Sequence, residues 1–221
     1  MIFNIKKNII RIIFFILLNL FFLFNICDVV YAQTQSSSSQ SSQQSSSTSQ
    51  KVSTATEFTY SFFSFSKNYD SLKSQATNNG YKFTEKEINT IFGKYLLILE
   101  KVYQTYTESL YIFFNEKKEP IFISITYTLM TKSSRSFLEK LFLEIKKVLN
   151  DKYGPSQRED LPYYRNFNDK YEIILSPLFA ASISFDLQVK FNEKYLAYID
   201  YYNKEVSKVQ DAEISTIVKQ Y

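Results

Sequence analysis

The chain has 221 residues, of which 45% are hydrophobic and 22% are charged, a composition typical of a globular protein with one main domain. Its formal net charge is +4. Residues 1–32 carry half of that charge, so the remainder is too weakly basic to indicate a nucleic-acid-binding surface. His is absent and the single Cys is Cys27, which excludes disulfides, thiol nucleophiles and Cys/His metal sites from any product that begins after it. We therefore expect no cofactor and no metal site.

Residues 1–32 have the three parts of a secretory signal peptide. A basic segment ends at Arg11, an apolar run follows over 12–26, and short residues stand before Gln33. This pattern predicts cleavage after Ala32 and export to the periplasm or the extracellular space.

Two other interpretations of the leader stay open. An uncleaved anchor would keep the protein in contact with a membrane, although the apolar run is shorter than the ~20 residues of a typical span. A lipoprotein would carry its lipid on Cys27, although Ile26 stands where a small residue is normally needed. Residues 33–56 are almost all Ser, Gln and Thr, which predicts a disordered spacer because they offer little apolar surface to bury.

The first half of the folded part begins with an aromatic-rich segment and ends in a hairpin. Ser66 is predicted to cap a helix, and Gly80 to end it. A second, short helix capped by Thr84 is one interpretation of the stretch that follows. The patterns predict, in order, a strand over 58–65, a helix over 67–79, a linking stretch over 81–93, a strand over 94–106 and hairpin strands over 110–114 and 121–129.

The second half is predicted to repeat this order. Its helix begins after Ser133 or Ser134, has one apolar face, and ends at Gly154. The patterns then predict a polar, aromatic linker over 157–168, a strand over 170–175, hairpin strands over 183–191 and 195–202, and a polar, partly helical tail.

Two sequence matches suggest that the halves arose by duplication. KYLLIL at 94–99 recurs as KYEIIL at 170–175, and FNEK at 114–117 recurs at 191–194 with nearly the same offset. Chance matches in a chain rich in Lys and Tyr are the alternative.

The predicted fold is α+β, with an antiparallel sheet of about seven strands and two main helices on one face. We expect one domain over 57–205, built from tandem halves at about 57–130 and 131–205, and a C-terminal tail over 206–221.

This arrangement, with the KYG-P turn at 152–155, resembles the folds of the β-lactamase-inhibitor protein and of small outer-membrane-assembly lipoproteins. It also resembles secreted bacterial proteins of unknown function. The resemblance implies a secreted binding or assembly module. It transfers no functional residue, because the inhibitor family relies on disulfides and Trp-containing surfaces, which a chain starting at Gln33 lacks.

The chemistry of the side chains favours binding over catalysis. No glycine-rich phosphate loop and no calcium-loop pattern is present. A secreted hydrolase that uses paired carboxylates is the alternative, and its candidates are Glu159, Asp160, Asp169, Glu172, Asp186 and Asp200.

Strand alternation places a set of aromatic residues on the face of the sheet without helices. Such a face could recognise a partner. Alternatively, loops or the tail cover these residues, or they form cross-strand pairs that stabilise the sheet. The predicted binding residues are Tyr111, Phe113, Phe122, Tyr198 and Tyr202.

We therefore expect a non-enzymatic module, secreted or periplasmic, that binds a protein, a peptide or an envelope component and binds no nucleic acid. The alternatives are the carboxylate-dependent hydrolase and a structural protein anchored in the envelope by an uncleaved leader.

Overall fold

The computed structural model describes residues 55–130, 134–179 and 182–218. The predicted leader, the lipidation candidate Cys27 and nearly all of the predicted spacer lie outside the described residues, as does the alternative helix cap Ser133.

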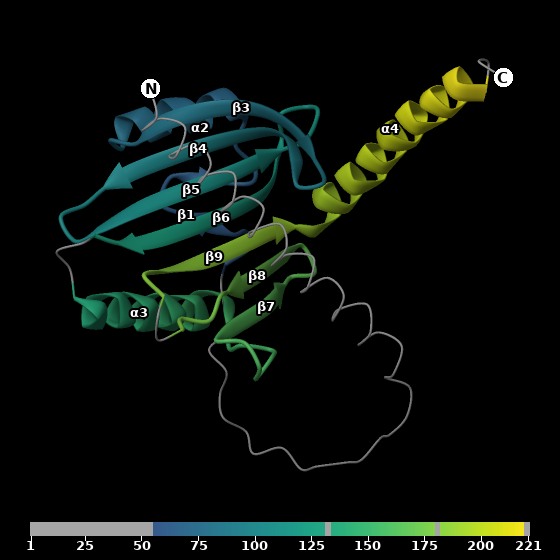
Figure 1. Ribbon diagram of the computed structural model, residues 1–221. Coiled ribbons are helices and arrows are strands. Elements are labelled where there is room, and N and C mark those ends of the chain that lie inside the picture. Colours follow the sequence, from purple (N-terminus) through teal and green to yellow (C-terminus); the bar gives the residue numbers. More distant parts are fainter. Residues whose placement is uncertain (1–54, 131–133, 180–181, 219–221) are drawn as a thin grey trace, which may run out of the picture. The chain divides into compact units, whose positions relative to one another are not determined.

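Seven antiparallel strands form the main sheet, in the order β3-β4-β5-β6-β9-β8-β7 (Figure 1). Their bounds are β3 Lys82–Thr90, β4 Gly93–Val102, β5 Tyr106–Phe114, β6 Pro120–Leu129, β7 Tyr163–Phe167, β8 Tyr171–Leu175 and β9 Ser184–Phe191. The prediction of an α+β fold with a sheet of about seven antiparallel strands is confirmed. Two segments predicted as strands are not part of this sheet: 58–65 forms a small hairpin, and 195–202 lies in a helix.

The strand register separates an apolar face of the sheet from a mixed one. Directly paired residues share a face, and one row runs across five strands through Leu97, Ile112, Ile123, Val189 and Ile173, all fully buried. We call this side the core face. The neighbouring row on the opposite side, the open face, runs through Ile98, Tyr111, Ser124, Gln188 and Ile174.

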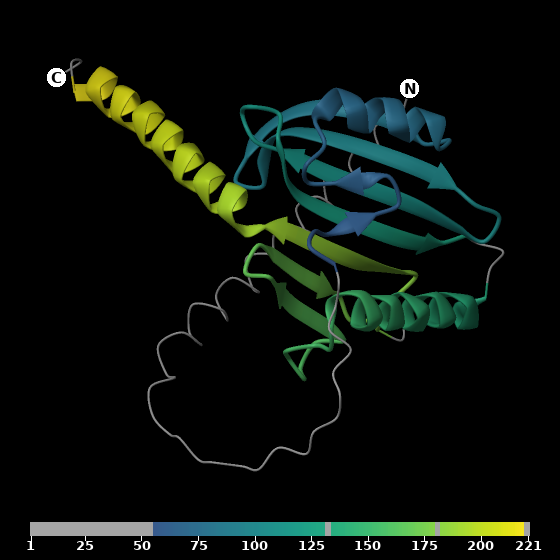
Figure 2. The same ribbon diagram turned by 180° about the vertical axis from the view of Figure 1, so that it is seen from behind.

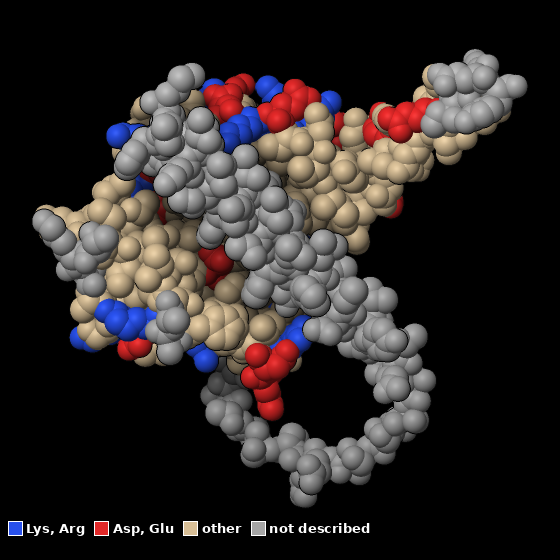
Figure 3. Space-filling view, viewed as in Figure 1, with Lys and Arg blue, Asp and Glu red and all other residues tan. Residues whose placement is uncertain are grey.

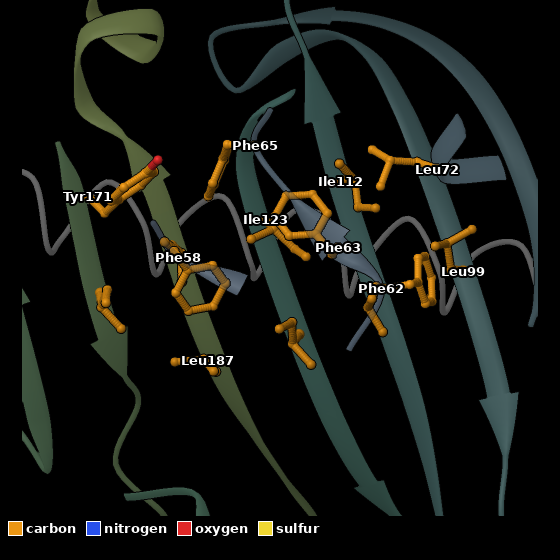
Figure 4. Close-up of a cluster of buried hydrophobic side chains, with 14 of the residues drawn as sticks. Phe58, Phe62, Phe63, Phe65, Leu72, Leu99, Ile112, Ile123, Tyr171 and Leu187 are labelled. Carbon is orange, nitrogen blue, oxygen red and sulfur yellow. The ribbon is translucent and has the colours of Figure 1, made fainter. Parts of the chain in front are cut away.

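Two helices and a small hairpin cover the core face. They are α2 (Tyr69–Asn78), α3 (Arg135–Tyr153) and the pair β1 (Thr59–Tyr60) and β2 (Phe63–Ser64), all of which lie in front of the sheet in Figure 2. Apolar side chains of these elements join those of the strands in one buried cluster. Figure 4 shows Phe58, Phe62, Phe63 and Phe65 spread over the core face between Leu187 of β9 and Leu99 of β4.

The prediction of a single strand over 58–65 is wrong. The segment turns back at Ser61, whose φ is 50°, and forms the two-residue strands β1 and β2. Four consecutive residues, Phe62 to Phe65, are buried, and a strand covered on one face cannot bury consecutive side chains.

Both predicted helices are present, with one different cap. The Asn68 side chain accepts a hydrogen bond from the Ser71 backbone N–H at 2.8 Å, so Asn68 caps α2 in place of the predicted Ser66. Ser134 occupies the N-cap position of α3 without a side-chain hydrogen bond. Gly80 and Gly154 follow the two helices with φ of 78° and 93°, as the predicted stops require.

Two segments predicted as links are edge strands. Residues 82–90 form β3 in place of the predicted short helix, because Phe83, Thr84 and Ile88 suit an extended chain and charged residues are tolerated at a sheet edge. The predicted linker over 157–168 contains β7, whose Tyr163 and Phe167 are buried.

The predicted hairpin of 183–191 with 195–202 is also wrong. Strand β9 pairs with β6 and β8, and the chain then enters α4 (Asn192–Val218), a helix of 27 residues. The segment that holds Tyr195, Tyr198 and Tyr202 fits the period of a helix as well as it fits the alternation of a strand. In the helix, these residues pack towards β6. The same FNEK letters therefore form a hairpin turn after β5 and the start of a helix after β9.

No described helix is both long and apolar enough to cross a membrane. Within the described residues, α2 is followed by β3, β4 and β5, and α3 is followed by β7, β8 and β9.

Candidate functional site

The open face of the sheet is the surface that α2 and α3 leave uncovered. Among the described helices, α4 reaches it, at the end of β6 and β9 where that helix begins. The second half of α4 leads away from the sheet (Figure 1), and its side chains from Ser207 to Thr216 are exposed.

An aromatic cluster fills the junction between α4 and the sheet. Phe113 and Phe122 stack with ring centroids 5.1 Å apart, and Tyr195 of the helix lies 6.2 Å from Phe122. The Tyr198 hydroxyl donates to the Thr90 carbonyl at 2.8 Å, which ties the helix to the end of β3. We call this set the α4 cluster: Ile121, Phe122 and Tyr198 are buried, and Phe92, Phe113, Tyr195, Tyr201 and Tyr202 pack against them.

A groove of about 360 Å³ lies beside the α4 cluster, between α4 and the turn that joins β3 to β4. Aromatic and aliphatic side chains of the helix form most of it, and polar side chains stand on both sides. We call it the α4 groove; its lining residues are Asn89, Lys94, Tyr198, Tyr201, Tyr202, Glu205, Val206, Val209 and Gln210.

The α4 groove is lined mainly by neutral side chains, with one basic residue, Lys94, and one acidic residue, Glu205. Burial raises the pKa of Tyr195, in the adjoining α4 cluster, to about 12 and also raises the pKa of Tyr198, so both phenols stay neutral near pH 7. The Glu205 carboxylate accepts a hydrogen bond from the Lys208 ammonium at 2.7 Å. The groove therefore offers stacking surface, neutral hydrogen-bonding groups and the ammonium of Lys94.

The structure brings four of the five predicted binding residues together. Tyr198 and Tyr202 line the groove, while Phe113 and Phe122 lie in the cluster beneath it. Tyr111 lies elsewhere on the open face, paired with Ile98 and Ser124. Phe122 and Tyr198 are only 3% and 2% exposed, so they support the surface more than they form it.

Sequence reasoning missed most of the groove. The predicted strand over 195–202 includes Tyr198 and Tyr202, whereas Val206 and Val209 fall in the predicted tail, so the sequence did not bring these residues together. The usable signal was the three- and four-residue spacing of Tyr195, Ile199, Tyr202, Val206 and Val209, which is the spacing of a helix stripe.

The carboxylates proposed for hydrolysis are spread over several elements. Glu159, Asp160, Asp169 and Asp200 are exposed, and Asp160 pairs with Arg158. Glu172 pairs with Lys190 at 3.1 Å, and Asp186 accepts a hydrogen bond from the Thr126 hydroxyl at 2.7 Å. The lining of the α4 groove includes one carboxylate, Glu205, whereas the hydrolytic mechanism uses two. The described residues form no cluster of three potential metal ligands among His, Cys, Asp and Glu.

Comparison with known protein families found none that matches the chain, and neither the curated proteins nor the solved structures that were searched include a match. The resemblance to inhibitor-like and assembly-lipoprotein folds therefore stays an expectation from the sequence.

Proposed function

We propose that the protein is an exported, non-enzymatic binding or assembly module, and that it recognises a protein, a peptide or another envelope component through the α4 groove and the adjoining open face. The observation that carries this proposal is the groove itself, with Tyr201 and Tyr202 half-buried over a packed aromatic floor.

Half-exposed aromatic side chains on a rigid support are the usual anchors of binding surfaces. The described residues give the Tyr201 and Tyr202 hydroxyls no hydrogen-bond partner, so both can bond to a ligand while their rings stack on it. The contact of Tyr195 with Phe122, whose ring centroids are 6.2 Å apart, joins the start of α4 to the sheet.

Replacing one anchor tests this surface. Tyr202→Ser, with Tyr164→Ser as a control half-buried tyrosine on β7, should be immobilised beside the unaltered chain and exposed to envelope extract. Loss of an aromatic anchor costs roughly 2 kcal/mol, so partner recovery should fall at least tenfold for Tyr202→Ser and stay unchanged for Tyr164→Ser. Equal recovery by a folded Tyr202→Ser protein would remove the groove from the proposal.

Export is tested separately by the mass of the protein isolated from cells. A mature chain that begins at Gln33 is the expected result. A chain that retains residues 1–32 would favour the envelope-anchored structural protein instead.

We also propose that the two halves arose by duplication. In each half a helix precedes at least three antiparallel strands; a fourth strand, β6, follows in the first half, whereas α4 follows in the second. KYLLIL and KYEIIL lie in the second of these strands, β4 and β8, and each FNEK begins at the last residue of the third, β5 and β9. An experimental structure in which the two helix-plus-three-strand units fail to superpose would count against this origin.

A further inference from the structure

The two edge strands of the main sheet, β7 and β3, differ in the hydrogen bonding of their outward backbone groups. At the β7 edge, the Tyr164 carbonyl accepts from the Gln157 N–H at 2.8 Å, the Tyr164 N–H donates to the Ser156 hydroxyl, and the Asn166 N–H donates to the Gln157 side chain. This loop therefore occupies backbone groups that another strand would need. Along Lys82–Glu87 of β3, by contrast, the described residues supply no backbone partner besides β4.

The part of the β3 edge that pairs with no second strand among the described residues is regular over six residues. Its pairing with β4 runs without interruption from Lys82 opposite Glu100 to Glu87 opposite Tyr95. The register then shifts, and Asn89 adopts a φ of 46°, which ends the regular edge. A regular, unpaired edge is a template to which an extended peptide can add as a further strand.

The charges of β3 are sorted by face. Glu85 lies towards α2, where it accepts a hydrogen bond from the Tyr69 hydroxyl at 2.9 Å and forms an ion pair with Lys73. Because side chains alternate along a strand, Phe83 and Glu87 share that side, and Lys82 and Lys86 take the open-face side. Figure 3 shows basic and acidic groups gathered along the rim of the molecule where α2 and β3 lie.

This distribution of charges disfavours pairing of β3 with the β3 strand of a second copy of the chain. In an antiparallel pair within one sheet, opposite residues share a face. A pair centred on Thr84 would place Lys82 opposite Lys86. A pair centred on Glu85 would place Glu85 opposite itself, and one centred on Lys86 would place Glu85 opposite Glu87. Every extensive register therefore meets like charges, which disfavour the pair.

We propose that the β3 edge is a strand-addition site for an extended peptide of complementary alternating charge. Such a peptide carries acidic residues opposite Lys82 and Lys86, basic residues opposite Glu85 and Glu87, and an apolar residue opposite Phe83. This site is separate from the α4 groove, so its failure and the failure of the groove are distinguishable.

Two blocked peptides of identical composition test the charge pattern. Read antiparallel to β3, Val-Lys-Glu-Lys-Thr-Val-Glu places an opposite charge at all four charged positions, and Val-Glu-Lys-Glu-Thr-Val-Lys places a like charge at each. With the protein as isolated from cells, at low salt, the first peptide should bind at least about tenfold more tightly by fluorescence anisotropy, since opposite charges across a strand pair attract and like charges repel. It should also slow amide hydrogen exchange over 82–87. Equal affinities, no binding of the first peptide, or protection confined to other segments would overturn the proposal.

A variant with reversed charges on β3 provides a second test of the proposal. Lys82→Glu with Lys86→Glu should weaken binding of the first peptide about tenfold. Lys204→Glu with Lys208→Glu makes the same change in net charge on the exposed part of α4, and should change binding less than twofold. Both variants should keep the circular dichroism of the unaltered chain. A similar loss of binding in both would show that overall charge attracts the peptide and would contradict an edge site.

Discussion

At the scale of single residues, Glu108 is the most constrained charged group among the described residues. Its side chain is buried on the core face and accepts hydrogen bonds from the Tyr60, Tyr81 and Tyr103 hydroxyls, the last two at 2.6 and 3.3 Å. Glu108→Gln should lower the free energy of unfolding by about 2–3 kcal/mol in urea, because an amide cannot accept all three bonds and its NH₂ would face donors. Tyr103→Phe, which removes the longest bond, should cost about 1 kcal/mol. Equal stability of Glu108→Gln and the parent would contradict this role.

The two helix-ending glycines make a matched pair of tests. Gly154 combines a φ of 93° with a ψ of 173°, a backbone conformation that residues other than glycine rarely adopt. An added Cβ would lie 3.4 Å from the Arg165 guanidinium. Gly80 has a φ of 78° and open space around it. We expect Gly154→Ala to cost about 2–3 kcal/mol and Gly80→Ala about 1 kcal/mol, measured by thermal or urea unfolding. The reverse order would show that the turn at Gly154 relaxes at little cost.

At the scale of elements, the sequence predicted those segments whose local signals agree with one another. Helix α3 has an apolar stripe and a glycine stop, and β5 and β6 alternate cleanly around a polar turn. The errors fell where two periods fit the same letters, as in Tyr195–Tyr202. They also fell on β3, whose charged residues suit an exposed helix and are equally compatible with an edge strand. The prediction of the candidate site was the least accurate, because the groove is formed by α4, and the start of α4 was predicted to be a strand.

The two halves of α4 should differ sharply in their importance for stability. Tyr198 is buried and hydrogen-bonded to Thr90, so Tyr198→Ala should lower the free energy of unfolding by about 3 kcal/mol. Side chains 211–216 are exposed, so removing residues 211–221 should change it by less than about 0.5 kcal/mol. Chemical unfolding of both variants measures this contrast. A large loss of stability on truncation would mean that the end of α4 packs against the folded part.

At the scale of the whole molecule, buried tyrosines should limit stability in alkali. Burial raises the pKa values of Tyr60, Tyr81 and Tyr127 well above the ordinary value near 10. The folded chain then keeps these protons while the unfolded chain releases them, so the stability is intact below about pH 10 and falls as the pH rises further, by ~1.4 kcal/mol per pH unit for each group.

Absorbance at 295 nm and circular dichroism, followed together from pH 9 to 12.5, measure this effect. We expect a large part of the tyrosine ionisation to coincide with a cooperative loss of structure. The chain unfolded in guanidinium should instead titrate near pH 10. Complete ionisation near pH 10 with the circular dichroism intact would show that these hydroxyls are not buried in the folded chain.

For the surface as a whole, we propose that a partner binds at the α4 groove, on the side of the sheet away from α2 and α3. Site-specific photo-crosslinking in the producing cells tests it most directly, with the photoreactive residue at position 202 and, as a control, at position 143, an exposed leucine of α3. A discrete crosslinked species is expected from position 202 and none from position 143. Crosslinks from position 143 alone would contradict binding at the α4 groove.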